Sequence, residues 1–114
     1  MIKEIALEEL KQEIQDFYDP KIWHFVCLNA DDIKGRCKLQ WIFSKYLSDS
    51  EYQIFTTTIS YDTIVPSIMD IIPSAIMSER EVVDLFGIDI QGIDKGLYLD
   101  ESSQKYPLRG DDNA

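Results

Sequence analysis

Basic residues are scarce in this 114-residue sequence, where 11 Lys and Arg stand against 21 Asp and Glu, giving a net charge of −10. Nucleic acids and anionic membrane surfaces attract clustered Lys and Arg, so this deficit excludes both as direct partners. Long apolar runs are missing as well, and we expect no signal peptide and no direct membrane insertion. Two cysteines and one histidine do not supply the ligand spacing of a zinc site.

The few cysteine and histidine residues are all expected to be structural. Cys27 and Cys37 lie in apolar, strand-like runs and are interpreted as reduced core residues of a cytoplasmic protein. If these runs pair around a turn near Asp32, Cys27 faces about residue 39, which argues against a disulfide with Cys37. His24 lies in the middle of an apolar strand, where we expect a buried sheet residue rather than a general base.

The remaining composition is that of a small folded domain. Hydrophobic residues make up 45% of the chain, which is ordinary for a globular protein. We expect one domain over residues 1–109 and a frayed tail over residues 110–114. The charge is uneven, because residues 61–114 hold 11 acidic and only four basic residues. This half would suit either solubility or contact with a basic partner.

The first half of the chain predicts a helix followed by a sheet. Leu7, Leu10, Ile14 and Phe17 recur at helical spacing, so residues 1–17 are expected to form an amphipathic helix that ends before Pro20. Three strand-like runs follow at residues 22–28, 38–47 and 52–61. Short polar links join them, which predicts an antiparallel meander whose first run, almost wholly apolar, is a central strand.

The second half predicts two helices. Ser67 with Asp70 resembles a capping box that opens a short helix over residues 68–72. A second helix is expected from Ser74 to about Phe86, with Gly87 as its C-terminal cap. Its buried face would carry Ala75, Val82 and Phe86, and Arg80 with Asp84 would pair on its exposed side. A short edge strand is expected at 88–90 or 97–99. The predicted fold class is therefore α+β, with both helices on one face of the sheet and an extended C-terminal tail.

These residues give little support for a catalytic, phosphate-binding or metal-binding site. No glycine opens a helix directly after a strand, so no phosphate loop is predicted. Glu81 and Asp84 could share a helix face as a metal or acid pair, but two carboxylates are too few for an oxygen-ligand site. The cluster Glu79, Arg80, Glu81 and Asp84 is otherwise a solvated helix face or a partner interface, next to the apolar Leu85 and Phe86. We predict no catalytic, cofactor-binding or metal-ligating residue.

Three segments carry a family resemblance: residues 66–75, the string 79–88 that contains Glu79-Arg80-Glu81 and Asp84-Leu85-Phe86-Gly87, and the terminal Tyr106-Pro107-Leu108-Arg109. Together they resemble the 30-kDa (C) subunit of NADH-quinone oxidoreductase, respiratory complex I, and the matching subunit of related membrane-bound NiFe hydrogenases. The resemblance implies a subunit without a redox centre that braces the large catalytic subunit on the cytoplasmic peripheral arm. It implies a partner interface made by the residues of 79–87 named above and by Tyr106, Pro107, Leu108 and Arg109.

Two departures from the complex I pattern favour the hydrogenase branch. Gly92 is followed by Ile93, where complex I members usually have Gly-His, and residues 94–99 replace an Arg-bearing stretch. The chain also ends soon after Arg109. The resemblance therefore implies an accessory subunit of an Ech-type energy-converting hydrogenase. The alternative is the 30-kDa (C) subunit of an NADH-quinone or F420-dependent oxidoreductase.

The implied partners are the large catalytic subunit, of the 49-kDa or NiFe-hydrogenase type, and the small iron-sulfur subunit of the same complex. An isolated chain that exposes this interface is expected to self-associate. Two other classes stay open on the residues alone. One is a free-standing acidic module that binds a basic protein, and the other is a small metal-dependent enzyme that uses Glu81 and Asp84.

Overall fold

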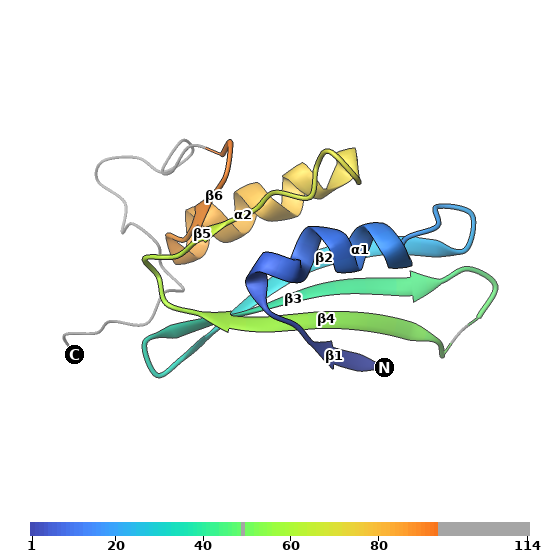
Figure 1. Ribbon diagram of the computed structural model, residues 1–114, viewed down its shortest axis with the longest axis horizontal. Coiled ribbons are helices and arrows are strands. Elements are labelled where there is room, and N and C mark those ends of the chain that lie inside the picture. The colour runs from blue at the N-terminus through green and yellow to red at the C-terminus, as the bar shows by residue number, and fades with distance from the viewer. Residues whose placement is uncertain (49, 94–114) are drawn as a thin grey trace.

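The computed structural model describes residues 1–48 and 50–93. In chain order the elements are β1 (Ile2–Glu4), the 3-10 helix η1 (Leu7–Glu9), α1 (Leu10–Phe17), β2 (Trp23–Ile33), β3 (Arg36–Lys45), β4 (Tyr52–Ile59), β5 (Ile64–Val65), the 3-10 helix η2 (Pro73–Ala75), α2 (Ile76–Phe86) and β6 (Asp89–Ile90). Strands β1 to β4 form a mixed sheet in the order β1-β4-β3-β2. Helices α1 and α2 lie on the same face of this sheet (Figure 1), which confirms the α+β class.

The N-terminal segment is shorter as a helix than predicted, because Ile2–Glu4 form a strand. This strand, β1, pairs parallel with β4 and places Ile2 opposite Ile54. The helical spacing does locate the buried face of α1, since Leu10 and Ile14 are fully buried. The prediction of one helix over residues 1–17 is wrong at its start, because the pairing partner of β1 is a strand distant in the sequence and periodicity does not report it.

The antiparallel meander is confirmed, with a different register at its first hairpin. The turn lies at Lys34 and Gly35, whose φ angles of 51° and 84° fit a two-residue type I′ turn. This turn lies further along the chain than predicted, so Cys27 faces Ile42 rather than residue 39. Beyond Cys27 a β-bulge shifts the register by one residue, which places Phe25 opposite Phe43. Both cysteines are free; Cys37 is a core residue as predicted, whereas Cys27 is only half-buried.

Strand β2 is one of the two outer strands of the four-stranded sheet, whereas its apolar sequence predicted a central position. Phe25 and Leu28 are buried, but Val26 is 48% exposed. His24 is exposed and its ring lies 5.9 Å from that of Tyr46. The prediction of a buried His24 is therefore wrong. Both helices cover the same face of the sheet, so the residues of this outer strand that point to the other face stay exposed, even though the strand is apolar.

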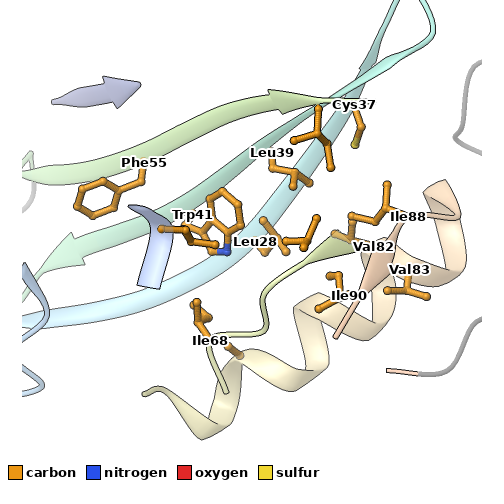
Figure 2. Packing of buried hydrophobic residues seen from close by; sticks show 14 of the residues in the cluster. Leu28, Cys37, Leu39, Trp41, Phe55, Ile68, Val82, Val83, Ile88 and Ile90 are labelled. Carbon is orange, nitrogen blue, oxygen red and sulfur yellow. The ribbon is translucent and has the colours of Figure 1, made fainter. Parts of the chain in front are cut away.

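Alternate residues of β3 form the centre of the core. Cys37, Leu39, Trp41 and Phe43 are all fully buried, and Figure 2 shows Leu39 and Trp41 extending from the sheet toward the side where α2 lies. At the α1 end, the Phe17 ring centroid lies 5.2 Å from those of both Phe43 and Phe55. The helices and their flanking turn add Leu10, Ile14, Ala75, Val82, Val83 and Phe86 to the same cluster. Burial by both helices thus holds the sheet from one face.

The segment before α2 forms no helix over residues 68–72. It makes a single turn, in which the Ile72 amide donates to the Ile68 carbonyl at 2.8 Å. Asp70 does not complete a capping box, because its carboxylate accepts a hydrogen bond from Lys11 at 2.7 Å. Ser67 does accept a hydrogen bond from a backbone amide of this turn, that of Met69. The Asp70 side chain, in contrast, is engaged by a residue far away in the sequence.

Helix α2 is confirmed with small shifts at its start. The 3-10 turn η2 precedes it, and the helix itself begins at Ile76, where its N-cap residue Ala75 makes no side-chain cap. Gly87 ends it with a φ of 71°, the left-handed geometry that glycine adopts at little steric cost. The strand expected at 88–90 appears as β6, which pairs with β5 in a separate two-stranded sheet. The alternative at 97–99 and the C-terminal tail lie outside the described residues.

Candidate functional site

Helix α2 carries most of the family-like string 79–88, hereafter the signature, and divides its residues between the interior and the surface. Glu79 is 1% exposed and Asp84 is 8% exposed, so both belong to the buried side chains of the chain. Glu81 is exposed, while Arg80 and Leu85 are half-buried. The part of the helix surface that is open to a partner therefore includes Arg80, Glu81 and Leu85, together with Met77, which precedes the string and is 75% exposed.

Glu79 binds the loop that precedes α2. Its Oε1 accepts a hydrogen bond from the Ser67 hydroxyl at 2.5 Å, and its Oε2 accepts one from the Ile68 amide at 2.8 Å. Burial raises the pKa of Glu79, and these two hydrogen bonds oppose that rise because they favour the carboxylate. The Glu79 side chain thus fixes the position of the 67–69 loop on the helix.

Asp84 does not lie on an exposed side of α2, contrary to the expected solvent-facing pair with Arg80. Its Oδ1 is buried and has no hydrogen-bond partner among the residues that the structure describes. A buried carboxylate oxygen without a donor is unfavourable. Asp84 is therefore a signature residue with a carboxylate oxygen, Oδ1, for which the described part of the chain supplies no hydrogen-bond donor.

A groove runs between the outer strand of the sheet and α2. Its volume is about 190 Å³, and its lining consists of Cys27, Leu28, Asn29 and Ala30 from β2 with Ser78, Glu81, Val82, Leu85 and Phe86 from α2. Two signature residues of the partly open surface, Glu81 and Leu85, thus stand over it. A second hollow of about 370 Å³ lies between β1 and α1, and the described residues that line it include none from the signature.

The groove is acidic where it is charged. Among the described residues of its lining, Glu81 alone carries a charge. Burial raises the pKa of the Cys27 thiol, and the negative charge of Glu81 raises it further. Cys27 is consequently a poor nucleophile at neutral pH.

The sequence located the helix side of this site and missed its strand side. The contribution of residues 27–30 depends on β2 being the outer strand, and no local pattern in those residues signals that position. Gly87 has the predicted role as helix cap. The predicted interface residues Tyr106, Pro107, Leu108 and Arg109 lie outside the described residues.

Within the part of the chain that the structure describes, no three His, Cys, Asp or Glu side chains come together as a metal-binding group. Over residues 1–48 and 50–93, no helix is long and apolar enough to cross a membrane.

Comparison with known proteins gives a consistent family. The model of the family described as "Respiratory-chain NADH dehydrogenase, 30 Kd subunit" matches residues 2–114. The C subunit of NADH-quinone oxidoreductase from Ruegeria pomeroyi is 37% identical over 90 residues, which cover 75% of this chain and 45% of that protein. The C/D 2 subunit of NADH-quinone oxidoreductase from Aquifex aeolicus is 26% identical over 91 residues, covering 77% of this chain and 16% of that protein. The chain thus spans less than half the length of these relatives.

A solved structure shares the fold. One chain in the structure of a membrane-bound sulfane sulfur reductase, described as an archaeal respiratory membrane complex, superposes with a TM-score of 0.78. The match covers 95% of this chain and 68% of that chain, at 19% sequence identity. This likeness supports the fold assignment.

Proposed function

Because the chain belongs to the 30-kDa subunit family of respiratory-chain NADH dehydrogenases, we propose that it is a non-catalytic accessory subunit that braces the large catalytic subunit of a membrane-bound respiratory complex. The observation that carries this proposal is the division of the signature helix. Glu79 is turned inward to hold the 67–69 loop, while Arg80, Glu81 and Leu85 remain at the surface. One side of the helix is thus held by contacts within the chain, and the other side presents charged and apolar groups to solvent. A docking surface requires such groups.

The proposed complex is an Ech-type energy-converting NiFe hydrogenase on the cytoplasmic face of the membrane. The departures at Gly92-Ile93 and residues 94–99 support this choice, and the fold likeness to a chain of an archaeal membrane complex is compatible with it. The second candidate is the 30-kDa (C) subunit of an NADH-quinone or F420-dependent oxidoreductase, which the names of both relatives favour. In either complex the proposed partners are the large subunit and the small iron-sulfur subunit.

Charge reversal on the open side of α2 tests the accessory role. Glu81→Arg and Arg80→Glu are each expressed in the native host with an affinity tag on this chain, and the copurified large subunit is quantified by mass spectrometry. Glu8→Arg is the matched control, because Glu8 is also exposed but lies in η1. We expect both α2 variants to recover several-fold less large subunit, while their melting temperatures stay near that of the parent chain. Normal recovery with both variants would contradict the interface role.

The identity of the copurified protein then separates the candidates. A NiFe-hydrogenase large subunit with hydrogen-oxidising activity supports the Ech-type complex. A 49-kDa-type subunit with NADH- or F420-linked quinone reduction supports the second candidate. A DNA-binding protein in place of both would instead support a free-standing acidic module. The genes that flank the coding sequence give an independent comparison of the same alternatives.

A further inference from the structure

The lining of the groove beside α2 exposes the main chain of β2. Four consecutive residues of this strand, 27–30, contribute to the lining. Successive side chains of a strand point to opposite faces of the sheet, so four in a row line one groove only where the groove follows the strand's edge.

The edge is long enough to pair with another strand. In the sheet that the structure describes, β3 is the neighbour of β2 on one side and no strand lies on the other. The bulge between Phe25 and Cys27 leaves a regular stretch from Cys27 to Ile33. This stretch contains neither lysine nor proline, two of the devices that commonly keep an exposed edge from pairing.

The charges at this edge select its partner. Glu81 stands over the groove, no Lys, Arg or His of the described chain lines it, and the exposed Asp31 follows on β2. Pairing between the β2 strands of two copies would bring these carboxylates together in chains that each carry a net charge of −10, and like charges across paired strands are unfavourable. A strand bearing Lys or Arg would instead find opposite charge.

The groove is also small for a metabolite. Small-molecule sites usually enclose roughly 300–1,000 Å³, whereas this groove measures about 190 Å³. An added strand needs only shallow contacts for alternate side chains, since main-chain hydrogen bonds supply much of the affinity. Leu85, Val82 and Phe86 provide such apolar contacts along the wall of α2.

We propose that the outer edge of β2, over residues 27–33, receives an extended basic segment of the large partner subunit as an additional strand, with alternate side chains in the groove under Glu81 and Leu85. This inference rests on the proposed function and specifies how the partner is held. It adds a main-chain contact at the sheet edge to the side-chain contacts of α2.

Hydrogen exchange tests the geometry in the native assembly. Amide exchange is compared at single-residue resolution between the free full-length chain and the chain in its purified complex. We expect alternate amides of residues 27–33 to slow by at least tenfold in the complex. The opposite edge strand, residues 2–4, is the internal control and should change little. Protection of residues 80–85 without any at 27–33 would overturn the added strand and leave the proposed function standing, whereas protection of neither region would overturn both.

Synthetic peptides test the chemistry on the free chain. The probes are ten-residue peptides that alternate Lys with Val or Glu with Val, together with a Lys-Val peptide N-methylated at every second amide. We expect NMR shifts at residues 27–30 and at Glu81 with the Lys-Val peptide, binding at least fivefold weaker for the Glu-Val peptide, and no binding for the methylated one. The Glu81→Lys variant should bind the Lys-Val and Glu-Val peptides with more similar affinities than the parent chain does. Equal binding of all three peptides, or shifts confined to the opposite face of the sheet around Ile42, would overturn the proposal.

Discussion

Replacing Glu79 by alanine is expected to lower the free energy of unfolding by about 3 kcal/mol. The carboxylate accepts the Ser67 hydroxyl and the Ile68 amide in a site that is 1% exposed. Each buried donor left without its acceptor costs roughly 1–3 kcal/mol. The two donors together would cost roughly 2–6 kcal/mol, and the loss of a desolvated charge offsets part of that sum.

Urea unfolding followed by tryptophan fluorescence measures this loss, since Trp41 is fully buried and reports on the core. A loss of about 3 kcal/mol corresponds to a decrease in melting temperature of roughly 12 °C for a domain of this size. Glu81→Ala is the matched control on the same helix, and an exposed position of this kind changes stability by no more than about 0.5 kcal/mol. Equal denaturation midpoints for the two alanine variants would refute the reasoning.

Glu79→Gln separates the hydrogen bonds from the charge. The amide keeps an acceptor for one of the two donors, Ser67 or Ile68, so its cost at low pH should be small. Because burial raises the pKa of Glu79 in the folded chain, the folded state binds its proton more tightly than the unfolded state does. The parent chain should therefore lose stability relative to Glu79→Gln as the pH rises from the ordinary Glu pKa through the raised one. A pH-independent difference would contradict this sign.

Three further changes have defined outcomes. Gly87→Ala should destabilise the chain by about 1–2 kcal/mol in thermal unfolding, because a residue with a β-carbon is strained at a φ of 71°; an unchanged melting temperature would argue against this geometry. Lys11→Met should return the pKa of Asp70 toward its ordinary value in an NMR titration, since the hydrogen bond from Lys11 lowers it. The Lys11–Asp70 pair stabilises the fold at pH values above the ordinary Asp pKa, and this stabilisation is lost as the pH falls through the lowered pKa of Asp70. Glu81→Gln should lower the pKa of Cys27 and speed its alkylation by iodoacetamide, although burial, the larger cause of the raised pKa, remains; an unaltered rate would contradict the contact.

The elements that the sequence predicted well are those fixed by local pattern. The spacing of Leu10 and Ile14 indicated the buried face of α1, and Gly87 indicated the end of α2. The strand-like run at 38–47 indicated β3, which spans Arg36–Lys45. In each case the residues that decide the structure lie within a few positions of one another.

The failures all involve partners that are distant in the sequence. Asp70 was assigned to a local cap, yet its carboxylate is held by Lys11, 59 residues away. Glu79 was interpreted as part of a solvated helix face or a partner interface, but it is buried, and Ser67 and Ile68 compensate its burial. Composition does not distinguish an outer apolar strand from a central one. For this reason His24 was predicted to be buried, and the part of the groove that β2 forms was not predicted.

The parallel pairing of β1 with β4 has a consequence for biosynthesis. Ile2–Glu4 leave the ribosome well before their partners Ile54–Thr56, and at about 5–20 residues per second the delay is roughly 3–10 s. Throughout that interval the first strand has no place in the sheet, and β4 emerges with one edge unpaired. Strand β1 is thus translated before the rest of the sheet and is among its last parts to pair, because β4 must be complete before Ile2–Glu4 have a partner.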